Sequence, residues 1–487
     1  MLTIDLGTTM VKADVWHEGG PRAAGSAALR TEHPGPRRDE QDASTWWPAV
    51  VDAGAAARAE DPDAYAAVEV VALSGARQTV VAATDDGGTR GRAILWSDRR
   101  GVDHARAVAA RAGGAERVLQ RTGQHLDGGS VAAKLAWLDD CDPERLGRTR
   151  WLLAPRDLMI QRMVGEVVTD TTMATATGLY DADLAVVVEL VGAHLDRLAP
   201  PVEPGTVVGA LRDDPAAALG LRSGTPVVIG AGDRACEALG TDAAGPRAMV
   251  SWGTTANASR AVRARPDPVP DQLAVSRAVE PAHWLVEAGL SAAGSLLDRL
   301  SHRTGRTVGD VVAAARSVPP GADGVVVLPW LDGARAPWWR DDVDLQVLGA
   351  HDPEPAALAR AMLEGVARDL HRCLRTMSAS GSAVEAMALT GRGASVPTWV
   401  EVVTGVTGLP GVIRRSVRRG AGAAAVGTAL LAARSLGLDW SLDRLDPVDA
   451  VHEPDLTVVD RYAELAADAD RAAAAALGHR PDTDVRY

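Results

Sequence analysis

The sequence contains no phenylalanine, and aromatic residues make up only 3% of its 487 positions. Tryptophan and leucine must therefore fill the large positions of the hydrophobic core. Lysine is almost absent as well, because all 51 basic residues except Lys12 and Lys134 are arginine. Lys12 lies in a stretch rich in glycine and threonine, and in a chain so poor in lysine this position draws attention to that stretch.

Three widely spaced cysteines and no Cys-x-x-Cys pair argue against a cysteine-based metal site and against a disulfide framework. No apolar stretch reaches the length that spans a membrane, and the chain opens on a strand-like run instead of a signal peptide. The net charge of −13 is opposite to that of a general nucleic-acid binder. We therefore expect a cytoplasmic protein with neither a nucleic-acid nor a membrane partner.

Strand-like and helix-like segments alternate along the chain, which predicts the α/β class. At 487 residues the chain is too long for one ordinary hydrophobic core, so two domains are expected. The pattern restarts after a Gly-Pro pair, within the region 241–247. We place the domains at residues 1–244 and 245–475, and residues 476–487 are predicted to form a loose tail.

The segment Gly-Thr-Thr occurs twice, each time between two short apolar runs. The first copy lies in IDLGTTMVKADV at 4–15, and the second lies in AMVSWGTTANASRAV at 248–262. Backbone N–H groups and hydroxyls in such a turn suit phosphate oxygens, and Lys12 adds a positive charge. Asp5 precedes the first turn and can hold Mg²⁺, whereas Ser251 stands in its place before the second. A plain β-hairpin with a polar tip is the alternative for one copy, but two copies favour a two-sided phosphate site.

Two further segments combine a buried strand with a glycine-rich turn. In IGAGDRACEALG, Asp233 follows the strand at a helix start, where a carboxylate facing a crevice can act as a general base. The alternative is that Asp233 is an ordinary helix N-cap. In TGRGASVPTW, at 390–399, the missing side chains allow a nucleoside to approach the backbone, although a simple turn also explains this pattern.

Polar side chains near strand ends in the first half are candidates for contacts with a sugar or polyol. Arg77, Gln78 and Asp98 offer guanidinium, amide and carboxylate groups that hydrogen-bond hydroxyls. The alternative is that each is a solvated surface group, and this alternative is strong for the neighbouring Arg99 and Arg100.

These segments occur in the order found in the FGGY family of carbohydrate kinases, which the chain resembles over nearly its full length. The matching stretches are IDLGTTMVKA, AILWSDRR, KLAWL, VGEVVTDTTMATATGLYD, GTPVVIGAGDRACEALG, VSWGTTANA, LPWLDGARAP, LARAMLEGVA, LTGRGASVPTWVEVVTGVTGLP and GAAAVGTALLA. Their order and spacing together make the resemblance specific.

The resemblance implies an α/β protein with the two-domain, actin-like and ribonuclease-H-like ATPase fold, in which ATP and sugar occupy the interdomain cleft. It implies transfer of the γ-phosphate of ATP, with Mg²⁺, to a hydroxyl of a sugar or polyol. Asp233 matches the catalytic base of the family, and Asp5 matches the acid near the metal. The positions that match its nucleotide contacts are Gly7, Thr8, Thr9, Lys12, Gly253, Thr254, Thr255, Gly294, Gly391, Gly393 and Ala394.

The substrate side departs from the family pattern. The run Arg77-Gln78-Thr79 is closer to the Arg-Glu-Thr run of glycerol kinases than to the Gln-Met-His-Gly run of xylulose kinases. A ketopentose such as xylulose is the expected substrate. The alternatives are glycerol or another polyol, and a sugar acid whose carboxylate meets Arg77 and Arg234. The residues expected to bind the substrate are Arg77, Gln78, Asp98, Asp233 and Arg234.

Two interpretations from other classes stay open at this point. An actin-like or chaperone-type ATPase shares the fold without a sugar substrate, and it has no use for the segments ILWSDRR and TDTTMATATGLYD. A non-catalytic sugar sensor is the other, and the presence of both Asp5 and Asp233 argues against it. A homodimer is one assembly that we leave open.

Overall fold

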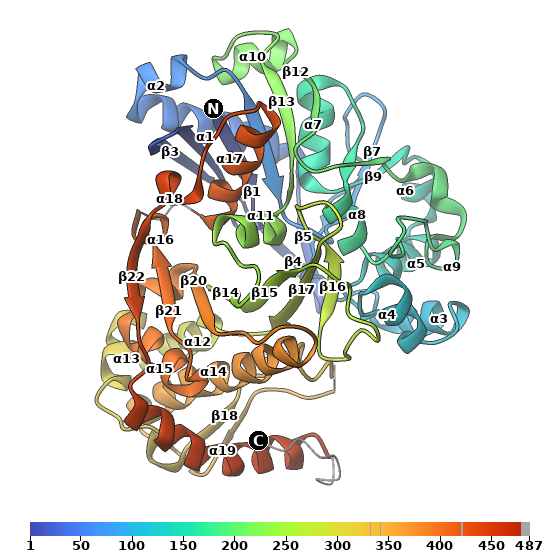
Figure 1. The fold of residues 1–487 in the computed structure, drawn as a ribbon. Coiled ribbons are helices and arrows are strands. Elements are labelled where there is room, and N and C mark those ends of the chain that lie inside the picture. The colour runs from blue at the N-terminus through green and yellow to red at the C-terminus, as the bar shows by residue number, and fades with distance from the viewer. Residues whose placement is uncertain (332, 341, 420–421, 479–487) are drawn as a thin grey trace.

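The computed structural model describes residues 1–331, 333–340, 342–419 and 422–478. Two large β-sheets with their helices lie one above the other in Figure 1, with the sheet that contains the N-terminus at the top. The α/β class expected from the alternation of strands and helices is therefore confirmed.

The first sheet has the strand order β12-β13-β6-β1-β2-β3. Its strands are β1 (Leu2–Leu6), β2 (Met10–His17), β3 (Gly20–Ala28), β6 (Val71–Gly75), β12 (Val207–Ala210) and β13 (Pro226–Gly232). Strands β1, β6 and β13 run parallel, whereas β2, β3 and β12 pair antiparallel with their neighbours. The three parallel strands are mostly buried and apolar, as strands covered on both faces require.

The second sheet has the order β16-β17-β15-β14-β20-β21-β22. Its strands are β14 (Arg247–Trp252), β15 (Ala256–Val262), β16 (Ala274–Arg277), β17 (Trp284–Leu290), β20 (Ala386–Thr390), β21 (Gly411–Arg414) and β22 (Val448–His452). Strands β14, β20 and β21 run parallel and the others antiparallel. Apart from β16, this order and these directions repeat those of the first sheet. The two halves of the chain therefore share one sheet topology, and each has its Gly-Thr-Thr turn between two antiparallel strands.

Helices cover the outer faces of both sheets. Helix α1 (Trp46–Glu60) packs against β2 and β3, and α14 (Pro355–Ala379) packs against β15 and β17. The other helices of the second layer are α12 (Gly294–Thr304), α13 (Val308–Ala315) and α15 (Pro397–Thr407). The side chain of Asp42 caps a short 3₁₀ turn that leads into α1.

Two helices cross between the sheets. Helix α11 (Asp233–Gly240) follows β13, and α17 (Ala423–Ser435) comes from the late part of the chain and also contacts β1, β6 and β13. A Cβ added to Gly240 would lie 2.1 Å from a backbone oxygen of α17. One added to Gly427 would lie 1.9 Å from the carbonyl oxygen of Cys236. Backbone therefore meets backbone at this crossing, because neither glycine position leaves room for a side chain.

The remaining elements connect the two sheets or extend their edges. Around the first sheet these are β4 (Glu32–Gly35), β5 (Arg38–Gln41), α2 (Pro62–Ala66), β7 (Val81–Ala83), β8 (Ala93–Ile94), α3 (Val102–Arg111), α4 (Ala115–Thr122), α5 (Val131–Cys141), α6 (Pro143–Gly147), β9 (Trp151–Leu153), α7 (Pro155–Val164), β10 (Thr169–Asp170), α8 (Thr171–Ala176), α9 (Val188–Val191), β11 (Pro201–Val202) and α10 (Asp213–Leu219). Around the second sheet these are β18 (Val326–Leu328), β19 (Gln346–Leu348), α16 (Arg415–Arg419), α18 (Leu442–Leu445) and α19 (Leu456–Ala476). Most of the predicted tail, 479–487, lies outside the described residues.

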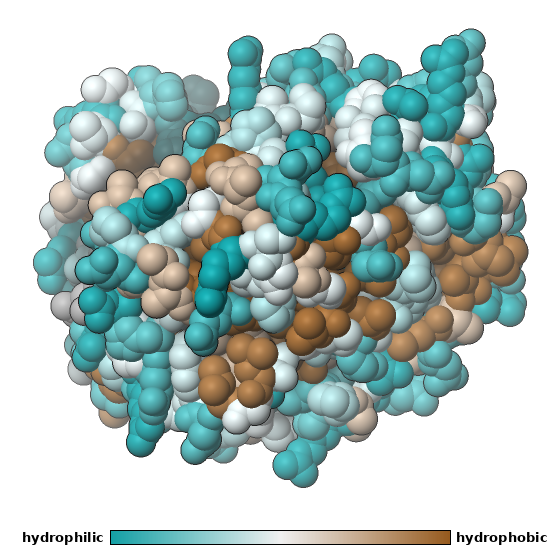
Figure 2. Space-filling view, turned by 90° about the horizontal axis from the view of Figure 1, so that it is seen from above, coloured by the Kyte–Doolittle hydropathy of each residue, from teal (hydrophilic) through white to brown (hydrophobic). Residues whose placement is uncertain are grey.

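Tryptophan occupies large core positions, as the absence of phenylalanine predicted. Trp16, Trp46, Trp252 and Trp330 are each at most 2% exposed. The face above the first sheet is a mosaic of hydrophilic and hydrophobic residues (Figure 2). Among the described residues, none of the helices combines the length and the apolar composition needed to cross a membrane.

Asp14 is a buried carboxyl group on β2 that lies close to Asp5 and Glu60. One oxygen of its side chain, Oδ2, has no hydrogen-bond partner in the described part of the chain, and the residue is only 3% exposed. Burial raises the pKa of Asp14 to about 7, although Lys12 opposes this shift. Folding therefore takes up a proton between about pH 4 and pH 7, and the contribution of Asp14 to stability falls as the pH rises through that interval.

We expect Asp14→Asn to raise the unfolding temperature at pH 8, where the native carboxylate is buried and charged. A rise of roughly 2–4 °C corresponds to about 1 kcal/mol. The gain should shrink at pH 5, because the wild-type carboxyl group is then protonated in the folded protein. The measurement is a thermal unfolding scan at both pH values, with Asp52→Asn, an exposed position on α1, as the control. An equal gain at both pH values contradicts this account.

Candidate active site

The carboxyl ends of three parallel strands bring the candidate residues of the first half together. In the register of the sheet, Asp5 of β1 lies beside Ser74 of β6, and Gly75 lies beside Gly232 of β13. Arg77 and Asp233 follow directly after β6 and β13. Ligands of open α/β sheets bind at such strand ends, so this edge is the expected place for a site.

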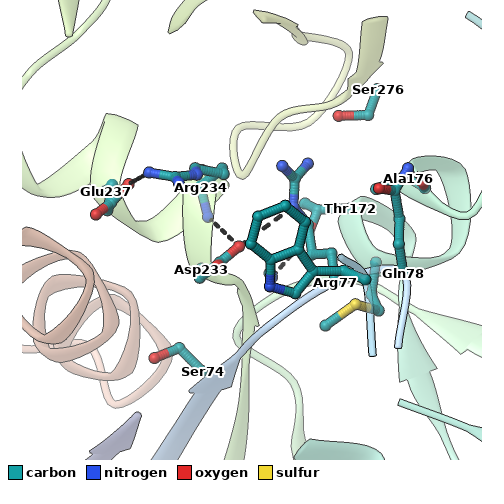
Figure 3. A network of polar contacts seen from close by, with 12 residues as sticks. Ser74, Arg77, Gln78, Thr172, Ala176, Asp233, Arg234, Glu237 and Ser276 are labelled. Atoms are coloured by element: carbon teal, nitrogen blue, oxygen red, sulfur yellow. Dashed lines mark hydrogen bonds and ion pairs between the residues drawn. The ribbon is translucent and has the colours of Figure 1, made fainter. Parts of the chain in front are cut away.

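Asp233 is the first residue of α11 and points into the space between the sheets. The helix N-cap is Gly232, and no side chain caps this helix end, so the capping alternative for Asp233 does not apply. Asp233 Oδ1 accepts hydrogen bonds from Arg77 Nε at 3.2 Å and from the backbone N–H of Arg234 at 2.7 Å (Figure 3). No described residue donates to Oδ2, and the side chain is 31% exposed. One carboxylate oxygen of Asp233 is thus held, and no described residue holds the other, while the residue itself lines a cavity.

Arg77 joins the two sheets through carboxylates on both sides. Its Nη1 and Nη2 donate to Glu287 Oε2 at 2.6 Å and Glu287 Oε1 at 2.7 Å, while its Nε contacts Asp233. Glu287 lies on β17 of the second sheet, and its side chain is 7% exposed. The guanidinium of Arg77 holds the pKa of Glu287 below its usual value despite burial, with smaller effects of Arg234 and Arg335.

A cavity of about 300 Å³ lies at this junction, between the two sheets. The first half contributes Asp39, Arg77, Gln78, Trp96, Ser97, Arg99, Gln124, His125, Asp127, Gly129, Asp233 and Arg234. The second half contributes Thr255, Ala256, Asn257, Ala274, Glu287, Gly289, Leu290, Ser291, Leu331, Arg335 and Trp339. Four of the five residues expected to bind the substrate therefore line one cavity.

Asp98 is the exception. Its side chain is fully buried and does not line the cavity. Arg100 donates to both carboxylate oxygens of Asp98, at 2.9 and 2.7 Å, and the backbone N–H of Asp39 donates to Oδ2 at 2.8 Å. The expectation that Asp98 contacts the substrate is corrected: it supports the wall of the cavity through Asp39. Arg100 is also largely buried, so it is not the solvated surface group that the sequence suggested.

Gln78 is held in an unusual backbone conformation at the cavity wall. Its φ of 60° lies in the left-handed region, which costs free energy for a residue other than glycine. The carbonyl oxygen of Gln78 accepts a hydrogen bond from Lys134 Nζ at 3.0 Å, and its Nε2 donates to the carbonyl oxygen of Ala176 at 3.1 Å. Burial lowers the pKa of Lys134 to about 7. The second lysine of the chain thus fixes the segment that carries Arg77.

The first Gly-Thr-Thr turn contacts the cavity wall through the side chain of Trp96. Trp96 lines the cavity, and its Nε1 donates to Thr8 Oγ1 at 2.8 Å. The turn itself closes with the backbone N–H of Gly7 donating to the carbonyl oxygen of Met10 at 3.2 Å, and the carbonyl oxygen of Thr9 accepts from a neighbouring backbone N–H at 2.8 Å. Lys12 pairs with Asp5 across β1 and β2 but does not line the cavity.

The second turn packs against the start of α12. Gly294 donates its backbone N–H to the carbonyl oxygen of Gly253 at 2.8 Å, and the N–H of Ser295 donates to that of Thr254 at 3.1 Å. A Cβ on Gly294 would lie 2.5 Å from the oxygen of Gly253, so only glycine allows this approach. Thr255, the last residue of the turn, lines the cavity.

The glycine-rich loop after β20 lies against the strand that leads to the second turn. Gly391 has φ 80°, and a Cβ on it would lie 2.6 Å from the carbonyl oxygen of Trp252. A Cβ on Gly393 would lie 1.8 Å from the indole of the same tryptophan. Ala394 is buried beside this contact. The loop expected to contact adenosine and the second phosphate turn therefore form one continuous surface.

Two local features fit a nucleotide phosphate and a divalent cation. Among the described residues, a Cβ built on Gly253 meets no atom within 4 Å and the buried Ser295 Oγ has no hydrogen-bond partner, so the turn offers open space and an unused polar group. Asp5 Oδ1 accepts a hydrogen bond from Ser74 at 2.8 Å, and burial raises the pKa of Asp5 to about 6. A half-buried carboxylate close to Asp233 is the type of oxygen ligand that Mg²⁺ prefers.

Sequence reasoning missed the residues that the second half adds to the cavity. Glu287, Arg335 and Asn257 lie in or next to strands of the second sheet, and the polar groups at 257 and 287 interrupt apolar runs. Such a polar position inside a buried strand is a usable signal, because a buried charge needs a partner. Asp127 and Arg99, which form an ion pair in the first half, were missed or assigned to the surface as well.

The structure has one six-stranded and one seven-stranded sheet of the same topology, with a cavity between them at the strand ends. These features define the class of protein. It is a two-domain α/β protein with the actin-like, ribonuclease-H-like fold. The FGGY family of carbohydrate kinases matches the chain with its N-terminal domain at residues 1–240 and with its C-terminal domain at 248–436. The chain belongs to this family, and it is therefore a sugar phosphotransferase for which the family implies ATP as a substrate.

Three similar proteins cover nearly the whole chain. A xylulose kinase from Escherichia coli (strain K12) is 30% identical over 475 residues, which are 94% of this chain and 95% of that protein. A gluconokinase from Bacillus subtilis (strain 168) is 24% identical over 93% of this chain and 90% of that protein. The crystal structure of a xylulose kinase from Rhodospirillum rubrum superposes with a TM-score of 0.85 at 25% identity, over 98% of each chain.

We expect Gly232→Ala to reduce phosphoryl transfer by about tenfold or more, because small misplacements of catalytic groups have large effects. The added Cβ would lie 2.6 Å from Arg77 Cδ and would push this side chain away from Glu287 and Asp233. The measurement is the steady-state rate of ADP release with a saturating sugar. Gly309→Ala, whose Cβ meets only Thr307 Oγ1 at 3.7 Å on α13, is the matched control. Equal rates for the two variants would contradict the expected displacement of Arg77.

Proposed function

We propose that this kinase transfers the γ-phosphate of ATP to a hydroxyl of a ketopentose such as xylulose, with Asp233 as the general base. The observation that carries the proposal is the geometry of Asp233. Its Oδ1 is held by two donors, no described residue donates to its Oδ2, and the residue lines a cavity of about 300 Å³. A cavity of this size with several polar groups suits a small sugar.

In this mechanism Asp233 Oδ2 accepts the proton of the attacking hydroxyl as the new bond to phosphorus forms. Arg77 and the backbone N–H of Arg234 hold Oδ1, which fixes the plane of the carboxylate. Gln78 and Arg234 line the same cavity and orient the other hydroxyls of the sugar. Holding the nucleophile in line and supplying a base are the contributions that phosphoryl transfer requires from a protein.

The nucleotide is assigned to the surface formed by the two turns and the loop after β20. Gly7, Thr8, Thr9 and Lys12 contact its phosphates from the first sheet. The residues that contact it from the second sheet are Gly253, Thr254, Thr255, Gly294, Gly391, Gly393 and Ala394. Asp5 is the proposed ligand of Mg²⁺, through water. ATP with Mg²⁺ supplies the phosphoryl group and neutralises charge on its oxygens.

The choice of a ketopentose is supported by the names of the similar proteins. Relatives from Escherichia coli and Streptomyces coelicolor, 30% and 29% identical, are xylulose kinases and match this chain over at least 93% of its length. The segment around Arg77 and Gln78 departs from the pattern of xylulose kinases, so the acceptor needs a direct test.

We expect Asp233→Asn to lower the rate of phosphoryl transfer by on the order of 10²–10⁴-fold, the usual contribution of a general base. ATP should bind as in the wild type, because the proposed nucleotide surface does not include Asp233. The rate is measured by coupled ADP release with xylulose, ribulose, glycerol, erythritol and gluconate, and ATP binding by calorimetry. Asp52→Asn is the control, because this acid is exposed on α1.

Xylulose should give the highest kcat/KM in this panel. Normal turnover of Asp233→Asn would refute the assignment of the base. ATP hydrolysis at the same rate with and without every sugar would instead favour an actin-like or chaperone-type ATPase.

A sugar acid is the second candidate acceptor, because Arg335 is a charged group of the cavity without an ion-pair partner among the described residues. Its Nε is buried without a hydrogen bond, and its guanidinium lies 5.8 Å from the ring centre of Trp96 and 5.7 Å from that of Trp339. The Asn257 amide lies nearby, since both groups approach the same face of Gly289. Arg77 and Arg234, which the sequence suggested for this role, are instead paired with carboxylates.

If the acceptor carries a carboxylate, we expect Arg335→Gln to lower kcat/KM for gluconate by about 10–100-fold, which corresponds to the loss of a charged hydrogen bond. The value for xylulose should change little, because a neutral sugar has no group that needs the charge. The measurement is the ratio of the two kcat/KM values in each variant. Arg303→Gln, at an exposed position of α12, is the control for loss of one positive charge. An unchanged ratio in Arg335→Gln excludes this second candidate.

A further inference from the structure

Glu287 is a buried carboxylate of the second sheet that neither the sequence motifs nor the proposed chemistry uses. It holds both terminal nitrogens of Arg77, at 2.6 and 2.7 Å, while the base contacts only Arg77 Nε. We propose that Glu287 is a positioning residue. It keeps the two terminal guanidinium nitrogens of Arg77, called its fork below, away from Asp233, so that Oδ2 of the base stays available for the acceptor hydroxyl. This inference rests on the proposed role of Asp233.

Two carboxylates, Glu287 and Asp233, are close enough to pair with the guanidinium of Arg77. In the structure, Glu287 takes the bidentate pairing, and Asp233 accepts a single bond at 3.2 Å. The side chain of Arg77 runs over Gly232, directly before Asp233 in the chain, so the fork is close enough to turn to Asp233. A bidentate arginine–carboxylate pair is the stronger arrangement. Without the carboxylate at 287, both oxygens of Asp233 would therefore be taken by Arg77.

Glu287 is well suited to compete for Arg77, because it is buried and charged. The residue is 5% exposed, and Arg77 lowers its pKa against the effect of burial. Ser276 Oγ, on the neighbouring strand β16, lies 3.5 Å from Oε2 of Glu287 and adds a weak donor. Asp233 is more exposed, at 31% of its side chain, and its Oδ1 already accepts from the N–H of Arg234. The pairing of Arg77 with Glu287 is thus favoured while the two sheets are in contact.

The location of Glu287 links the base to the approach of the two sheets. Arg77 and Asp233 both belong to the strand ends of the first sheet, whereas Glu287 lies in β17, where it pairs with Ser259 of β15. Contact between the sheets draws the fork of Arg77 across the cavity. Separation of the sheets would return it to Asp233. The base is consequently ready for proton transfer only when the second sheet is in place.

The experiment is a double-mutant cycle on Arg77 and Glu287, with kcat and the KM for ATP measured on the acceptor that the wild type uses best. We expect Glu287→Gln to lower kcat by on the order of 10²-fold with little change in the KM for ATP. Glu287→Asp, which keeps the charge on a shorter side chain, should recover part of the loss. In the Arg77→Met background, Glu287→Gln should cause no further loss, because it acts only through Arg77. Glu385→Gln, at an exposed position of the second half, is the control.

Additive losses in the double variant, or a normal kcat in Glu287→Gln, would overturn the inference. A role limited to stability would lower the unfolding temperature of every Glu287 variant without the coupling to Arg77. If Glu287→Gln does not fold, Glu287→Asp in the wild-type and Arg77→Met backgrounds provides the same cycle. The experiment distinguishes a wrong proposed function from a wrong role of Glu287. A wild type that phosphorylates no sugar contradicts the proposed function, whereas an active wild type with an uncoupled cycle contradicts only the role of Glu287.

Discussion

The guanidinium of Arg77 is the interaction on which the arrangement of this site depends. It is the point where a carboxylate of the first sheet, Asp233, and a carboxylate of the second, Glu287, are joined by one side chain. Removing one of these three charges leaves a buried or partly buried charge without its partner, and such a loss is more harmful than the intact group is stabilising. This contact joins the segment after β6 to β17 at the cavity, which all three side chains line.

The cavity wall is unusually rich in arginine, and the charges are balanced locally. Arg99 pairs with Asp127, Arg234 with Glu237, and Arg77 with its two acids. Arg335 is the arginine of the wall that has no such pairing among the described residues. A neutral sugar meets mainly satisfied groups there, whereas an anionic one would find an unused charge. If the acceptor is a sugar acid, selectivity is expected to depend on Arg335, which lies in the family stretch LPWLDGARAP but was not predicted as a site residue.

Local sequence patterns predicted those features of the fold that short-range interactions determine. The repeated turn, the parallel strands and the placement of Asp233 at a strand end follow from periodicity, glycine and the geometry of parallel sheets, and the FGGY resemblance supplied the fold. The pairing of Arg77 with Glu287 spans 210 positions, and no local pattern encodes such a partner. Asp98 shows the converse. Its place near a strand end suggested a contact with the substrate, but in the structure its charge is paired with the neighbouring Arg100. The domain bounds and the nucleotide contacts stay predictions.

The crossing of α11 and α17 fixes the helix that begins with Asp233. Because Gly240 and Gly427 bring backbone against backbone, the helices have no layer of side chains between them that could shear or repack. Helix α17 also packs on β1, β6 and β13, the parallel strands of the first sheet. The close contact therefore ties the start of α11, and with it the carboxylate that lines the cavity, to the first sheet.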